Sequence, residues 1–184
     1  FINPALAARY GTDSMPETGE NVAGQFQISR ADQDAFAYAT QMKWKRAHDS
    51  GFFRNEIVPM AVPQRKGEAR IVDTDEHPRP DTTLAGLARL KPIVKPTGTI
   101  TAGNASGVND GAAALLLTTP EAARRFQLTP LARVVAGAVA GVEPRIMGMG
   151  PAPATRKVLE RAGLKLGQMD VIELNEAFAS QSLA

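Results

Sequence analysis

Cysteine is absent from the 184 residues, and histidine occurs only twice. Without cysteine, these residues form no disulfide, hold no metal through thiolates and supply no thiolate nucleophile. His48 and His77 have no second histidine or carboxylate at metal-ligand spacing, so we expect no metal site. With only two histidines, a Ser/His/Asp catalytic triad within these residues is possible only in principle. His48 is interpreted as a solvated residue of a helix, and His77 as part of a proline-rich loop.

The chain also lacks a long apolar run and a strong charge of either sign. No stretch reaches the ~18 consecutive apolar residues of a membrane-spanning helix, and no charged-then-apolar leader opens the sequence. The formal net charge of +2 is too small to form an electrostatic footprint for nucleic acid. Hydrophobic residues make up 43% of the chain, enough for a buried core. We therefore expect a globular, cytoplasmic protein that binds neither membranes nor nucleic acid.

Both ends of the chain look like the interior of a longer polypeptide. The sequence opens in an apolar stretch at Phe1 and stops at Ala184, within the helix-forming run 176–184. No Gly, Asn or Pro signals the end of that run. We expect an internal piece of a longer protein, and a complete small protein with a processed start is the alternative.

The first half of the sequence predicts a loose α+β arrangement. Ser29 and Asp32 form a capping-box pattern and Gly51 is a stop signal, so residues 29–51 are expected to form a helix. The other expected elements here are two short strands and a short helix, at 56–62, 69–73 and 84–90.

The second half alternates apolar runs with amphipathic stretches, a pattern typical of an α/β sheet. Its apolar runs predict strands buried on both faces at 107–118 and 131–142, and residues 171–174 are expected to form a short strand. The helices expected between and after them lie at 120–127, at 151–162 and from 176 onward. Pro151 opens the second of these helices and Gly163 ends it. We place a domain boundary near residue 106, where the composition changes.

Residues 147–151, Met-Gly-Met-Gly-Pro, are similar to the start of a dinucleotide-binding fingerprint. Pro153 stands where the third glycine belongs, and several residues separate the preceding predicted strand from the first glycine. The hypothesis of a nicotinamide-dependent enzyme would therefore depend on an incomplete motif. The glycines instead predict a tight loop of small residues packed against something bulky.

Two polar segments favour a binding or catalytic site. Residues 101–111 place three Gly, three Asn or Asp and one Ser next to an apolar run, which allows a ligand to approach the backbone closely. A tight structural turn is the alternative. Residues 175–178 lie where a predicted strand becomes a helix, a usual position for site residues in α/β folds. Here the alternative is that Asn175 only caps the last helix.

Three stretches in this order and spacing resemble the thiolase family, acyl-CoA acetyltransferases that make or cleave 3-oxoacyl-CoA. The stretches are TAGNASGVNDGAAA from residue 101, MGMGPAPA from 147 and LNEAFA from 174. The resemblance runs from end to end and includes residues 15–18, 21–23, 29–34, 56–59 and 79–84. The details MPET and RPDTTL look most like the 3-oxoadipyl-CoA thiolases of aromatic catabolism.

The resemblance implies an α/β fold: part of a layered αβαβα thiolase core, with an inserted α+β loop domain that covers coenzyme A. Residues 1–106 would be most of this loop domain. Residues 107–128 would end the N-terminal thiolase half, and residues 129–184 would begin the C-terminal half. The resemblance also implies a homodimer or homotetramer for the full-length protein.

For catalysis, the resemblance places the nucleophilic Cys, its activating His and a second, acid/base Cys outside these residues. Asn175 is then the one catalytic residue present. In the family this Asn holds a water that forms an oxyanion hole together with the missing His. Coenzyme A thioesters are the implied substrates and partners, and no cofactor is expected.

For substrate binding, the resemblance implies that Ser106 hydrogen-bonds the pantetheine arm and that Ala102 and Ala105 leave room for it. Arg79 would lie over or beside the adenine. The apolar pantetheine and acyl tunnel would be lined by Leu6, Met15, Met147 and Phe178. Plain packing is the alternative for each. Ser14 stands where many biosynthetic members have His, which argues against simple acetoacetyl-CoA synthesis.

The expected function is therefore that of a thiolase piece whose parent transfers acetyl groups between coenzyme A thioesters. The 184 residues by themselves should be inactive, because no cysteine is present to form the acyl-enzyme. A non-catalytic fragment that binds coenzyme A or another protein is the alternative.

Overall fold

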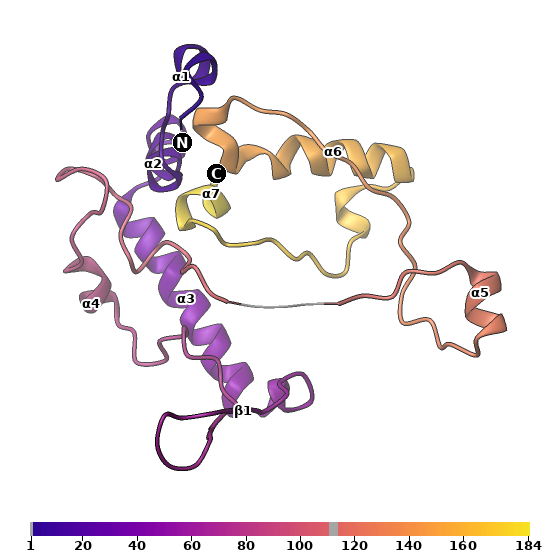
Figure 1. The fold of residues 1–184 in the computed structure, drawn as a ribbon. Helices are drawn as coiled ribbons and strands as arrows, with labels where there is room; N and C mark the ends of the chain where they lie inside the picture. The colour runs from indigo at the N-terminus through magenta and orange to yellow at the C-terminus, as the bar shows by residue number, and fades with distance from the viewer. Residues whose placement is uncertain (1, 111–113) are drawn as a thin grey trace.

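The computed structural model describes residues 2–110 and 114–184 (Figure 1). The α-helices are α1 (Pro4–Tyr10), α2 (Met15–Gln25), α3 (Arg30–Asp49), α4 (Leu84–Ala88), α5 (Pro120–Arg125), α6 (Pro151–Ala162) and α7 (Ala179–Leu183). Short 3-10 helices are η1 (Phe52–Asn55), η2 (Pro144–Met149) and η3 (Leu166–Gln168). Among the described residues, no helix combines the length and apolar character needed to cross a membrane.

The predicted boundaries of α3 and α6 are confirmed, because local signals set them. The Ser29 hydroxyl accepts a hydrogen bond from the Asp32 amide at 3.1 Å and donates one to the Asp32 carboxylate at 2.6 Å. Helix α6 spans the predicted 151–162 and ends at Gly163. There φ is +66°, in the left-handed region that glycine tolerates best.

The two short strands of the first half are confirmed as an antiparallel hairpin. Strand β1 (Met60–Val62) pairs with β2 (Arg70–Val72), so that Met60 lies opposite Val72. Strand β1 begins only after Pro59, which has no amide hydrogen to donate to a ladder. The hairpin lies beyond the end of α3 (Figure 1) and away from the core.

The strands predicted for the second half are wrong, because none of them forms in the described part of this structure. Residues 107–110, 114–118, 131–142 and 171–174 form no ladder, and residues 111–113 of the first prediction lie outside the described residues. Leu115 and Leu131 are 90% and 99% exposed. An extended segment becomes a strand only when a neighbour takes up its amide and carbonyl groups. Within residues 2–110 and 114–184, these segments pair with no other backbone segment; side chains of Lys157 and Arg161 donate only to the carbonyl oxygens of Val139 and Gly137.

The core lies where α2, the start of α3, residues 99–104 and α7 meet (Figure 1). Val22 on α2 and Ile100 are fully buried. The hydroxyl of Ser180, also fully buried, donates to the carbonyl oxygen of Gly19 at 3.0 Å. Helix α7 begins at Ala179, three residues later than predicted. The core therefore brings together the two polar segments that the sequence singled out.

Candidate functional site

The GNAS loop (residues 101–107) is hydrogen-bonded to the NEAF segment (residues 175–178). The Ser106 amide donates to the Ala177 carbonyl, and the Ala179 amide donates to the Asn104 carbonyl, each at 2.9 Å. These two bonds flank an antiparallel bridge between Ala105 and Phe178. Phe178, not Asn175, occupies the N-cap position of α7, so the alternative role of Asn175 as a cap is wrong.

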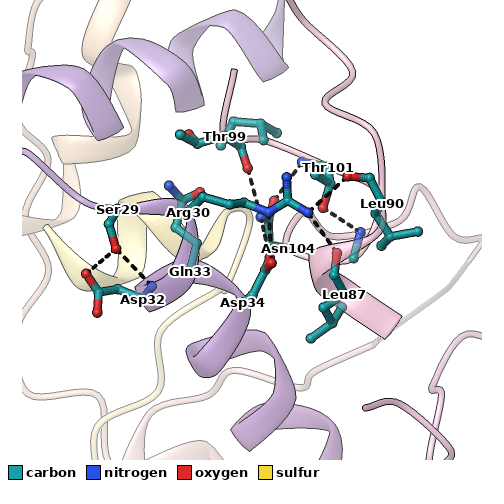
Figure 2. Close-up of polar contacts among 12 residues, drawn as sticks. Ser29, Arg30, Asp32, Gln33, Asp34, Leu87, Leu90, Thr99, Thr101 and Asn104 are labelled. Atoms are coloured by element: carbon teal, nitrogen blue, oxygen red, sulfur yellow. Dashed lines mark hydrogen bonds and ion pairs between the residues drawn. The ribbon is translucent and has the colours of Figure 1, made fainter. Parts of the chain in front are cut away.

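The side chain of Asn104 holds the GNAS loop in its bend (Figure 2). Its oxygen accepts from the Thr101 amide at 2.8 Å, and its nitrogen donates to the Thr99 carbonyl at 3.0 Å and to Asp34 at 3.1 Å. Asn104 is only 4% exposed. Three hydrogen bonds from one buried amide leave the loop little freedom to change shape.

Asp34 on α3 connects this loop to a partly buried ion pair (Figure 2). Arg30 Nε donates to Asp34 Oδ2 at 2.8 Å, and the Asp34 side chain is 7% exposed. The same guanidinium donates from Nη2 to the carbonyl oxygens of Leu87 and Leu90, at 2.7 and 3.0 Å. The Arg30–Asp34 pair thus links α3 to the GNAS loop through the carboxylate and to the end of α4 through the guanidinium.

Glu20 on α2 anchors the strand-like stretch that enters the loop. Its Oε1 accepts from the amides of Thr99 and Ile100 at 2.6 and 2.8 Å, and its Oε2 accepts from the Thr99 hydroxyl at 3.0 Å. Sequence reasoning missed Glu20, Arg30 and Asp34 as supports of the site. The four-residue spacing of Arg30 and Asp34 was the visible signal, but their distant partners were not.

A small apolar pocket of about 30 Å³ brings together three residues predicted to line the acyl tunnel. Met15 comes from α2, Met147 from η2, and Phe178 precedes α7. Gly148 in the wall is close to Gln181, because a Cβ on Gly148 would lie 2.8 Å from Gln181 Cγ. This contact confirms the prediction that the Met-Gly-Met-Gly loop packs against a bulky group. Gln181 itself was missed by sequence reasoning.

A second pocket of about 180 Å³ lies between α3 and the GNAS loop. Ala105 and Ser106 line it on the loop side, as does Glu176 of the NEAF segment. Helix α3 contributes Thr40 and Gln41. His77, interpreted from the sequence as an ordinary loop residue, also lines this pocket. The described residues contain no group of three or more His, Asp or Glu that could hold a metal ion.

Arg79 lies on the surface with its guanidinium turned back on its own loop. Nη1 donates to the carbonyl oxygens of Glu76 and His77, both at 2.8 Å, and to that of Pro78 at 3.1 Å. The Arg79 amide donates to Gln41 Oε1 at 2.8 Å. The local fold of residues 76–79 is thus fixed by Arg79 itself and by α3.

Leu6, Ala102 and Asn175 are exposed, and they line neither of the two described pockets. Leu6 lies on α1, and Ala102 lies on the GNAS loop. Asn175 directly precedes Glu176 and Ala177, which line the larger and the smaller pocket. The structure therefore gathers five of the nine predicted site residues around the pockets, namely Met15, Ala105, Ser106, Met147 and Phe178.

An ion pair connects η2 to the residue that precedes the N-cap of α2. Helix α2 and η2 both contribute residues to the smaller pocket. Arg145 Nε lies 2.8 Å from Asp13 Oδ2, and Asn21 donates to the same oxygen at 2.7 Å and to the Arg145 carbonyl at 3.0 Å. The hydrogen bond from Arg145, followed by that from Asn21, holds the pKa of Asp13 below its usual value. The Asp13 carboxylate in turn raises the pKa of Arg145.

Acid is expected to destabilise the contact between η2 and the start of α2. The pKa of Glu17 is also lowered, first by a hydrogen bond from the Ser14 amide at 2.6 Å. A carboxylate whose folded pKa is depressed stabilises the fold above its unfolded pKa, about 4, and loses that contribution as pH falls through the folded value. Urea unfolding is measured between pH 2 and 6. As the pH falls, the free energy of unfolding should decrease less in D13N and E17Q than in the parent. Equal slopes for parent and variants would contradict this.

The family follows from the comparison with known proteins. The thiolase N-terminal domain matches residues 1–121, and the thiolase C-terminal domain matches residues 128–184. The chain therefore belongs to the thiolase family, as its motifs predicted. The proposed domain boundaries at 106 and 128 stay predictions.

Particular relatives refine this placement. Over 184 residues the chain is 60% identical to a beta-ketoadipyl-CoA thiolase of Acinetobacter baylyi, covering all of this chain and 46% of that protein. It is 57% identical to the 3-oxoadipyl-CoA/3-oxo-5,6-dehydrosuberyl-CoA thiolase of Escherichia coli, again covering 46% of it. The chain thus spans about half the length of the curated relatives it matches.

Solved structures confirm the α/β thiolase-like fold. The acetyl-CoA acetyltransferase of Bacillus anthracis superimposes with a TM-score of 0.88 at 47% identity, covering 92% of this chain and 43% of that one. Human mitochondrial 3-ketoacyl-CoA thiolase in complex with CoA gives a TM-score of 0.85, also at 47% identity, and covers 92% of this chain and 41% of that one.

Proposed function

We propose that these residues form the coenzyme A-facing part of a thiolase that transfers acetyl groups between coenzyme A thioesters, making or cleaving a 3-oxoacyl-CoA. The observation that carries this proposal is the hydrogen-bonded junction of the GNAS loop and the NEAF segment. Two family motifs, separated along the chain, meet there beside an apolar pocket and a larger pocket that is lined by both polar and apolar side chains. A thioester needs both kinds of surface, for its amide-bearing arm and for its acyl chain.

The substrate contacts divide between the two pockets. Ser106 would hydrogen-bond an amide of the pantetheine arm, and Ala102 and Ala105 would leave that arm space. The apolar acyl end would lie against Met15, Met147 and Phe178, with Leu6 nearby on α1. Arg79 would present its guanidinium to the adenine, an attraction of about 0.5–2 kcal/mol. The self-contained hydrogen bonds of Arg79 would keep it in place for that role.

Asn175 would act on the reacting thioester through a water molecule. An amide can orient one water so that it donates a hydrogen bond to the developing enolate oxygen. The side chain makes no covalent contribution in this scheme, so its effect depends on being held still. The nucleophile and general base would come from residues outside these 184, and coenzyme A would be a substrate, with no cofactor required.

For the acyl group we propose 3-oxoadipyl-CoA. The support is the chain's identity of 57–60% to relatives named for that substrate, together with Ser14, which stands where many biosynthetic family members have His. We also propose a cytoplasmic location, and a homodimer or homotetramer for the complete protein.

The test uses a hybrid enzyme in which residues 1–184 replace the matched segment of the Acinetobacter baylyi thiolase. This hybrid is expected to cleave 3-oxoadipyl-CoA with coenzyme A and to prefer it to acetoacetyl-CoA. Thiolysis is followed by the loss of the 3-oxoacyl-CoA absorbance. A folded hybrid without thiolysis would overturn the proposed activity, and a preference for acetoacetyl-CoA would overturn the proposed substrate.

The 184-residue chain assayed by itself is expected to bind coenzyme A without turning over any thioester. It contains no cysteine to form an acyl-enzyme. Calorimetry with coenzyme A, alongside the thiolysis assay, checks both points. Thioester cleavage that persists through repurification would contradict the expectation, whereas binding without activity in the hybrid would favour a non-catalytic coenzyme A-binding role.

A further inference from the structure

A hydrogen bond from α3 reaches the residue next to Asn175. The Thr40 hydroxyl donates to Glu176 Oε2 at 2.7 Å, across 136 residues of sequence. Both side chains are partly buried and line the 180 Å³ pocket beside Ser106. Hydrogen bonds to a charged group are stronger than those between neutral groups. The carboxylate of Glu176 is therefore held in one position by a helix of the opposite wall.

The segment that carries Asn175 has little regular structure of its own. Residues 169–176 belong to no helix or strand, and Asn175 is exposed. The backbone bonds to the GNAS loop begin at Ala177, and they leave the two preceding residues outside the bridge. The Glu176 side chain thus supplies a fixed point directly beside Asn175, where the backbone bridge does not reach.

Gln41, the next residue of α3, holds a different part of the site. Its Oε1 accepts from the Arg79 amide at 2.8 Å, so it fixes the loop that carries Arg79. Two consecutive residues of α3 therefore anchor two segments with different proposed roles. The segment with Asn175 would stabilise the transition state, and the loop with Arg79 would bind coenzyme A.

We propose that Thr40, through Glu176, is a positioning residue for Asn175, and that its contribution appears in turnover and not in coenzyme A binding. This inference rests on the proposed function. A misplacement of a reacting or stabilising group by about 1 Å can lower a rate up to about a hundredfold. By contrast, Gln41 would act on binding, because it orients only the Arg79 loop.

The kinetic test compares T40V, T40S and Q41M in the hybrid enzyme. T40V is expected to lower kcat by about ten- to a hundredfold with KM within about twofold of the parent, and T40S should restore most of the kcat. Q41M is expected to raise KM for coenzyme A about three- to tenfold with a smaller change in kcat. Parent-like kcat in T40V, or a T40S that does not recover, would overturn the proposal.

A second measurement separates this inference from the proposed function. Hydrogen–deuterium exchange is measured on the 184-residue chain, in a peptide that covers residues 173–180. T40V should accelerate exchange there while T40S and Q41M resemble the parent, whether or not the hybrid is active. Unchanged exchange in T40V would overturn the anchoring. An inactive parent hybrid with faster exchange in T40V would overturn the proposed function and leave the anchoring in place.

Discussion

Replacement of Asp34 by alanine is expected to destabilise the chain by about 3–5 kcal/mol, because it leaves the Arg30 guanidinium without its buried partner. The Asp34 side chain is 7% exposed and that of Arg30 is 23% exposed, so water compensates poorly for the loss. The change also removes the carboxylate that accepts from Asn104 in the GNAS loop. Urea unfolding of the 184-residue chain, followed by circular dichroism, measures the difference.

Helix α3 offers a matched control for this prediction. Asp49 forms an ion pair with Lys45 at the same four-residue spacing, but their side chains are 56% and 45% exposed. D49A is therefore expected to change the free energy of unfolding by at most about 1 kcal/mol. Similar decreases in the free energy of unfolding in D34A and D49A would show that burial does not make the Arg30–Asp34 pair more stabilising than an exposed pair.

Replacement of Asn175 by alanine in the hybrid enzyme is expected to lower kcat by about 10²–10³, or roughly 3–4 kcal/mol in the activation barrier. The change removes the amide that would orient a water toward the developing oxyanion, while leaving the Ser106–Ala177 and Asn104–Ala179 backbone bonds intact. KM for coenzyme A should therefore change little. Steady-state thiolysis kinetics measure both constants.

The control for this substitution is Asn55→Ala. Asn55 is an exposed asparagine at the end of η1, next to the hairpin and outside both described pockets. N55A should retain parental kcat and KM. A kcat for N175A within about threefold of the parent would remove Asn175 from the reaction, because losing an oxyanion donor costs far more.

Local signals explain what could be predicted of the fold. Ser29 and Asp32 are three residues apart and cap α3 with their own side chains, so no other part of the chain is needed. Gly163 ends α6 for a similarly local reason. The strands predicted at 131–142 and 171–174 failed because an apolar run records a preference for burial, whereas a strand needs a neighbour to pair with.

The candidate site also combines features that the sequence predicts with contacts that only the tertiary structure creates. The motifs around Ser106 and Asn175 were visible in the sequence and indicated the thiolase family, because each motif is a short contiguous run. The tertiary structure alone decided which side chains support them. Glu20 reaches Thr99, Asp34 reaches Asn104 and Thr40 reaches Glu176, across 79, 70 and 136 residues. Such contacts form only once packing has brought distant helices and loops together, and no spacing in the sequence encodes that distance.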